Sequence, residues 1–221
     1  MAARVSTAGF SACVVGFLPV RANLRVRDLL IASWPAERRA VERALPKGLE
    51  PADVDGRFLV SLVSFRVEGG RLGRLPVLPY SQLNARTYTT WRGEPAVFFL
   101  ASRVTALGLP GRALGAPFRL ARIRLRAGSN RAPGLGLLLA YRPGESTKVG
   151  LLGRHELGLF EARGLKAIRI ARGPAEWTRA EPTEPVEADF LLALGFEPAG
   201  QPELLYCSRT EFETEVPPQT L

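Results

Sequence analysis

The sequence predicts a β-rich α+β protein whose strands form a closed barrel or a sandwich. Turn-forming residues are frequent, with 22 Gly and 18 Pro among 221 residues, and this favours many short strands over long helices. Apolar runs of strand length lie between the turns, whereas only short stretches repeat at helical spacing. We expect a single domain over residues 1–221, because no internal repeat or low-complexity segment divides the chain.

Strands are predicted where apolar, β-branched or aromatic residues lie between turn signals. They cover residues 10–20, 23–32, 57–67, 80–91, 96–104, 118–126, 135–142, 165–171 and 204–216. Asp55-Gly56 predicts the turn before the third of these strands. Both faces of that strand are apolar, so we expect both to be buried. Residues 68–79 and 105–117 are expected to be loops, and residues 151–163 fit either a short helix or a hairpin.

Two helices are expected among these strands. The first begins at residues 33–34, with Pro35 in its first turn, where the missing N–H of proline costs nothing. Apolar residues then recur at helical spacing until Pro46 ends the helix. The second helix covers residues 187–195 and ends with Gly195 at its C-cap.

The charge balance points first to anionic partners, since the formal net charge is +9 and the isoelectric point is near 10.5. Of the 30 basic residues, however, only Lys47, Lys148 and Lys166 are lysines, and a GC-rich genome explains such a preference for Arg. The basic residues are also scattered, and no nucleic-acid-binding motif is present. We therefore do not expect nucleic acid as a partner.

Cysteine, histidine and hydropathy exclude several other classes of protein. Two cysteines, Cys13 and Cys207, are too few for a disulfide framework, and they form no CxxC motif. No run approaches the roughly 20 apolar residues of a membrane helix, and Pro19 interrupts the one stretch that faintly resembles a signal peptide. His155 is the single histidine, so no metal site is expected. We expect a cytoplasmic protein without a metal or cofactor.

The strand predicted over residues 118–126 carries an arginine on its apolar face. A strand has a period of two, so Arg119 shares a face with apolar residues while the other three arginines share the opposite, solvated face. An unpaired buried charge costs several kcal/mol, so an inward Arg119 needs an anionic ligand or a carboxylate such as Glu94 or Glu156. The alternative is that Arg119 lies at the strand end and reaches solvent.

The strand predicted over residues 80–91 carries a row of hydrogen-bonding side chains. Gln82, Asn84 and Arg86 share one face with Tyr88. This face either lines a small polar cavity inside a barrel or forms an ordinary wet surface of the sheet. Neither face of the strand is rich in bulky apolar residues, so the sequence leaves both interpretations open.

Three segments carry a resemblance to a known family: residues 24–65, 80–103 and 111–123. The Asn-Ala-Arg-Thr-Tyr run, followed by a Gly turn and a Phe-Phe-Leu strand, is the most specific part. From Leu24 to Val216 the chain resembles a bacterial family of uncharacterised proteins related to acetoacetate decarboxylase. The resemblance implies an antiparallel β-barrel with a few short flanking helices and an internal ligand cavity. Residues 1–22 are then either an extension outside the family or a first strand.

The resemblance also implies how the chemistry has changed. Acetoacetate decarboxylase forms a Schiff base on a lysine of lowered pKa, in a pair of lysines that follows a proline. Here Phe118 and Arg119 follow Pro117, and a phenyl ring forms no imine. Gln82 stands where the family usually has a Glu. None of the three lysines has an apolar sequence context, so Schiff-base decarboxylation is not expected.

These observations predict a protein that binds a small anionic or carbonyl-bearing ligand in a barrel cavity. The predicted site residues are Arg119 and Arg86, which hold the ligand, Gln82 and Asn84, which orient it, and Phe118, Phe98 and Tyr80, which form the walls. The sequence leaves open whether the protein is an enzyme. Alternatives are an enzyme that transforms a carbonyl or enol(ate) substrate without a Schiff base, and a structural or interaction protein with an occluded barrel. A homo-oligomer that buries edge strands is also expected.

Overall fold

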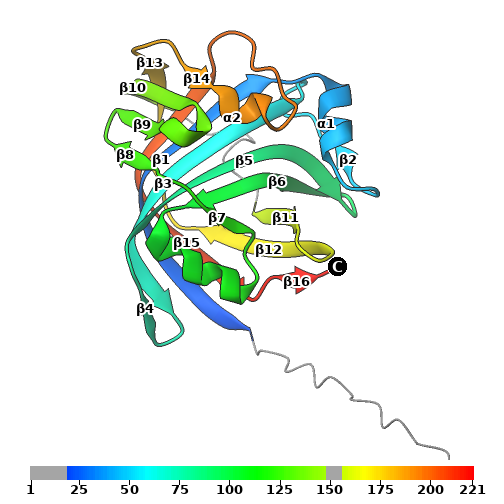
Figure 1. Cartoon of the computed structure of the whole chain (residues 1–221), viewed down its shortest axis with the longest axis vertical. Coiled ribbons are helices and arrows are strands. Elements are labelled where there is room, and N and C mark those ends of the chain that lie inside the picture. The colour runs from blue at the N-terminus through cyan, green and yellow to red at the C-terminus, as the bar shows by residue number, and fades with distance from the viewer. Residues whose placement is uncertain (1–18, 148–155) are drawn as a thin grey trace, which may run out of the picture.

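The computed structural model describes residues 19–147 and 156–221. The strands of this part of the chain join one sheet of 16 strands (Figure 1). Seven neighbouring strands follow the order β12, β11, β6, β5, β3, β1 and β15. They close into a barrel because the first and last of them, β12 and β15, also pair with each other. The barrel strands are β1 (Val20–Pro35), β3 (Leu59–Leu72), β5 (Tyr80–Trp91), β6 (Glu94–Val104), β11 (Leu157–Glu161), β12 (Leu165–Arg172) and β15 (Glu203–Val216).

The barrel is mixed. The prediction of a β-rich barrel is confirmed, but the prediction of a purely antiparallel one is wrong, because β11 runs parallel to β6. The other barrel neighbours pair antiparallel. Parallel neighbours need a long crossover connection. Here the chain supplies one, since it leaves the barrel after β6 and builds an outer layer before it returns at β11.

The remaining elements extend and cover the barrel (Figure 1). The shorter strands are β2 (Glu50–Pro51), β4 (Leu75–Val77), β7 (Phe118–Leu120), β8 (Arg124–Arg126), β9 (Ser129–Ala132), β10 (Leu137–Ser146), β13 (Trp177–Pro182), β14 (Glu187–Ala188) and β16 (Gln219–Thr220). The helices are α1 (Arg38–Ala44), η1 (Ala106–Leu114), η2 (Pro133–Leu135) and α2 (Asp189–Leu192).

Two hydrophobic cores lie on the two sides of the barrel wall. On β3, Val60 and Leu62 pack outward against the layer that contains α1, α2 and β10. Leu59, Val63 and Phe65 on the same strand pack inside the barrel. Both faces of β3 are therefore buried, as its two apolar faces predict.

Tertiary pairing overrides several local predictions. The first helix begins at Arg38 rather than at residues 33–34, because Trp34 and Pro35 still pair with β3. The predicted loop 68–79 contains a hairpin instead, formed by the end of β3 with β4. The strand predicted over residues 118–126 is broken, since only β7 and β8 at its two ends pair with other strands.

Some sequence predictions fall outside the described residues. They concern residues 10–18 of the first predicted strand, Cys13, Lys148 and His155. Within the described ranges, no helix has the length and apolar character needed to cross a bilayer. In the same ranges, no three His, Cys, Asp or Glu side chains form a group that could hold a metal ion.

Candidate functional site

A cavity of about 420 Å³ occupies one end of the barrel interior. It is lined by residues of β1 (Ala22 to Ile31), β3 (Val63 to Leu72), β5 (Tyr80 to Arg86) and the last half of β15, together with parts of β6, β11 and β12. Leu59, Tyr88 and Leu205 are buried inside the barrel beyond the cavity and fill its other end. We call this filled end the floor. The volume suits a small organic molecule, since ligand pockets span roughly 300–1,000 Å³.

One wall of the cavity is polar and comes from β5. Gln82, Asn84 and Arg86 all line the cavity and are buried. Gln82 Nε2 donates a hydrogen bond to Asn84 Oδ1 at 3.0 Å, and Arg86 Nη2 donates to the hydroxyl of Tyr88 at 3.3 Å. Of the two interpretations of this row, the structure therefore supports the cavity wall and excludes the wet sheet surface.

A second arginine, which the sequence reasoning missed, lies at the floor. Arg172, the last residue of β12, lines the cavity, and its guanidinium lies 5.5 Å from the ring centroid of Trp177. Burial, and then the charge of Arg86, lower the pKa of Arg172 to about 10, so it remains protonated at neutral pH. The alternation of Ile168, Ile170 and Arg172 was the signal for an inward arginine.

Buried hydroxyl groups fix the floor beneath Arg86. The Tyr88 hydroxyl lies 2.9 Å from Ser61 Oγ, and Ser61 Oγ lies 2.8 Å from Ser33 Oγ. All three side chains are buried. A buried hydroxyl without a partner is costly, so this chain of hydrogen bonds holds Tyr88 in one position. The Arg86 guanidinium lies over the Tyr88 ring, 5.5 Å from the ring centroid.

The opposite end of the cavity is apolar and is covered by η1. Gly108 of η1 is buried so closely against Tyr80 that a Cβ there would lie 2.8 Å from Tyr80 Cδ2. Gly111 makes a similar approach to the ring of Phe118. Burial raises the pKa of the Tyr80 phenol to about 12. Tyr80 and Phe118 thus line the cavity under η1.

Two predicted site residues lie elsewhere. Arg119 is exposed and pairs with Arg103 in the β6–β7 register. The pKa of Arg103 is lowered, mainly by the burial of Arg103 and in addition by the charge of Arg119. The prediction of an inward Arg119 is wrong, because β7 lies outside the barrel and is too short for the alternation to continue. Its suggested partner Glu94 instead accepts a hydrogen bond from Arg169 at 2.7 Å.

Phe98 is buried in the outer core and does not line the cavity. Val97 and Phe99 line it instead. The register of β6 against β5 shifts between Phe99 and Ala101, so one extra residue changes which side chains point inward. The prediction for Phe98 is therefore wrong by one position.

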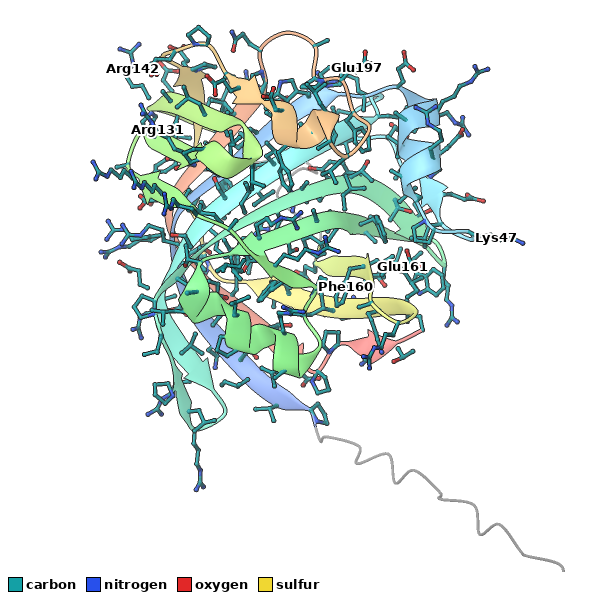
Figure 2. All side chains as sticks on the ribbon, viewed as in Figure 1. Lys47, Arg131, Arg142, Phe160, Glu161 and Glu197 are labelled. Atoms are coloured by element: carbon teal, nitrogen blue, oxygen red, sulfur yellow. The ribbon has the colours of Figure 1, made fainter. Side chains whose placement is uncertain are left out.

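The described lysines lie away from the cavity. Lys47 follows α1 at the outer edge of the molecule (Figure 2), and Lys166 donates a hydrogen bond to Thr220 Oγ1 on β16. Neither lines the cavity, which has no lysine among its described lining residues. Glu156, directly before β11, does line it. The occluded-barrel alternative predicted that no cavity remains, and the structure contradicts it.

Solved structures share this fold. The enduracididine biosynthesis enzyme MppR in complex with pyruvate has 12% identity and a TM-score of 0.59, over 95% of this chain and 92% of that one. An acetoacetate decarboxylase-like enzyme from Sphingomonas wittichii RW1 has 15% identity and a TM-score of 0.58, over 97% and 99%. Acetoacetate decarboxylase from Legionella pneumophila has 12% identity and a TM-score of 0.59, over 98% of each. Such identities establish the fold alone.

Sequence similarity places the chain in a family. It is 32% identical over 78 residues to the uncharacterised protein YqjF of Bacillus subtilis (strain 168), which is 34% of this chain and 32% of YqjF. A family model described as an uncharacterised conserved protein, DUF2071, matches residues 23–211. Because that match takes in most of the sequence, the chain belongs to the DUF2071 family, and its fold is that of the acetoacetate decarboxylase-like proteins.

Proposed function

We propose that this protein binds a small organic anion, such as a carboxylate or an oxo acid, inside the barrel. One observation carries the proposal: Arg86 and Arg172 both line a mostly apolar cavity of ligand size. A guanidinium binds a carboxylate through charge-assisted and often bidentate hydrogen bonds, which are stronger in a site that excludes water. Asn84 and Gln82 add amide groups on the same wall. Arg172 replaces Arg119 as the second ligand-binding cation.

Two further facts support the proposal, and the second of them argues against Schiff-base catalysis. The similar MppR structure is a complex with pyruvate, a small oxo acid. In this chain Phe118 lines the cavity where the resemblance expects a nucleophilic lysine, and its described lining contains no lysine. An imine is therefore not part of the proposal.

Isothermal titration calorimetry with pyruvate as the probe tests this proposal. Arg86→Met and Arg172→Met are each expected to weaken binding, since a hydrogen bond to a charged group contributes about 1.5–3 kcal/mol, or roughly 10–100-fold in Kd. Arg119→Met is the matched control and is expected to bind like the wild type, because Arg119 is exposed outside the cavity. Unchanged binding in both cavity variants contradicts the proposal, and so does a lysine adduct trapped by borohydride.

A second candidate function rests on Glu156. Its side chain lines the same cavity as Arg172. We propose as an alternative that Glu156 removes a proton next to the ligand carbonyl while Arg172 stabilises the enolate oxygen. Proton NMR in D2O then shows enzyme-dependent exchange of the pyruvate methyl hydrogens, which Glu156→Gln abolishes while pyruvate still binds. Exchange no faster than in buffer refutes this candidate and leaves the binding proposal intact.

A further inference from the structure

We infer that the ligand is an amphipathic acid, whose carboxylate lies at the floor between Arg86 and Arg172 and whose apolar body runs along the barrel axis to the mouth. This inference rests on the proposed function and names the class of its ligand. It comes from the distribution of charge and apolar surface along the cavity, which has a cationic inner end and an apolar outer end.

The positive charge is concentrated at the inner end, where Arg86 and Arg172 outnumber Glu156, the one carboxylate of the described lining. Arg86 and Arg172 each pack against an aromatic ring of the residues that fill the barrel beyond the cavity, Tyr88 and Trp177 respectively. Tyr88 follows Arg86 by two positions on the inward face of β5, so nothing deeper on that strand lines the cavity. An acid that reaches these guanidinium groups must enter headgroup first.

The middle of the cavity has one polar strip in an apolar tube. The strip is the Gln82–Asn84 pair, whose amides are hydrogen bonded to each other. Ser102 adds a hydroxyl opposite Asn84. Most of the remaining wall is aliphatic and aromatic and includes Leu29, Ile31, Val63, Phe65, Val97 and Phe212. Such surface contributes to affinity only when an apolar group covers it.

The mouth exposes apolar side chains to solvent. Leu75 and Leu78, on and after β4, are 66% and 56% exposed, and Leu107 of η1 is 53% exposed. All three also line the cavity. On β5 the six positions from Arg86 to Tyr80 span about 20 Å. A three-carbon oxo acid at the floor leaves most of that length uncovered and octanoate reaches about halfway along it, whereas dodecanoate covers most of it.

Exposed cations lie on the segments that form this mouth. The hairpin and η1 that carry the three leucines also carry Arg71, Arg74 and Arg112, all exposed. A positive rim raises the local concentration of anions and so favours entry of an acid over a neutral molecule of the same shape.

The test is a calorimetric series of unbranched acids with the full-length chain: propanoate, octanoate and dodecanoate, with octanol as the neutral control. Each buried methylene is expected to tighten binding about fourfold, so octanoate binds up to roughly a thousandfold more tightly than propanoate. Arg172→Met is expected to weaken all the acids and to leave octanol unchanged.

Variants at the mouth locate the tail. Leu78→Asn and Leu107→Asn are expected to weaken dodecanoate, whose tail reaches the mouth, more than propanoate. Leu192→Asn is the matched control, because Leu192 is 52% exposed on α2 and does not line the cavity. If pyruvate and all the acids bind with the same affinity, whatever their chain length, the amphipathic ligand is refuted but the proposed function stands. Octanol binding as tightly as octanoate overturns the carboxylate at the floor. Failure of every acid, pyruvate included, overturns the proposed function itself.

Discussion

Replacing Gly108 by Ala should lift η1 from the barrel and damage the roof of the cavity. The added Cβ would lie 2.8 Å from Tyr80 Cδ2 and 2.8 Å from Val104 Cβ, closer than real Cβ atoms approach other heavy atoms. The phenol ring can rotate, but Val104 Cβ is fixed to the backbone of β6, where Val104 is fully buried. The helix must therefore move.

The cost can be estimated from these contacts. One extra methyl group in a packed site costs about 1–3 kcal/mol, and the lower entropy of the unfolded alanine chain returns about 0.4–1 kcal/mol. The net loss of about 1–2 kcal/mol corresponds to a Tm lower by about 2–8 °C for a chain of this size. Binding of pyruvate should weaken as well, because Gly108 and its neighbours in η1 line the cavity.

Differential scanning calorimetry with Gly134→Ala as the control measures this effect. Gly134 lies in η2, where an added methyl group would have nothing within 4 Å and the backbone is not left-handed, so Ala there should leave Tm unchanged or raise it slightly. Equal Tm values for the two variants would refute the close packing of η1 on Tyr80 and Val104.

Three further substitutions test the barrel itself. Gly70→Ala should destabilise the protein far more than Gly56→Ala in urea denaturation. Both glycines have left-handed φ angles, but only the added methyl group at Gly70 would meet a backbone atom, the Asn23 carbonyl oxygen at 2.0 Å. Similar denaturation midpoints for the two variants contradict this prediction. Tyr88→Phe should lower the unfolding free energy by about 1–3 kcal/mol, because it leaves Ser61 without one of its buried partners; a stability equal to the wild type contradicts the buried hydroxyl chain. The hydrogen bond from Arg169 lowers the pKa of Glu94, so this pair stabilises the fold above the ordinary Glu pKa and stops doing so as pH falls through the lowered value. Glu94→Gln should therefore lower the free energy of unfolding by under about 1 kcal/mol at neutral pH, as for other exposed pairs, and leave it unchanged in acid. A destabilisation that grows as pH falls would have the opposite pH dependence and would refute the pairing.

Local signals predicted those parts of the site that one regular strand carries. The bounds of β5 were predicted as residues 80–91, because a Gly/Pro loop precedes the strand and Arg92-Gly93 forms the turn after it. Its period of two placed Gln82, Asn84 and Arg86 on one face, and this face lines the cavity. Nothing in the sequence of this strand alone could decide between cavity and solvent, since that depends on closure of the barrel by β12 and β15.

Alternation failed where a strand is irregular or leaves the barrel. The bulge beyond Phe99 interrupts the alternation of β6 between its two faces. The break after Leu120 separates Arg119 from Ile123 and Leu125, the buried residues whose face it was predicted to share. Bulges and breaks follow from how strands of different length fit around the barrel, so no local pattern encodes them. The same period-two argument, applied to β12, would have found Arg172.

The position of charge along the barrel separates this chain from the decarboxylase that it resembles. The resemblance places the reactive cations directly after Pro117, but here that segment contributes Phe118 to the cavity and turns Arg119 toward Arg103 outside it. Phe118 pairs with Ser102, which stands opposite Asn84, so Arg86 lies about 7 Å deeper, two residues along the same strand. With Arg172 also at the floor, a bound acid would hold its carboxylate deep and its tail beside Phe118. Phe118 offers no nucleophile to an oxo acid in that orientation, so in our proposal any chemistry on it falls to Glu156 and the two arginines.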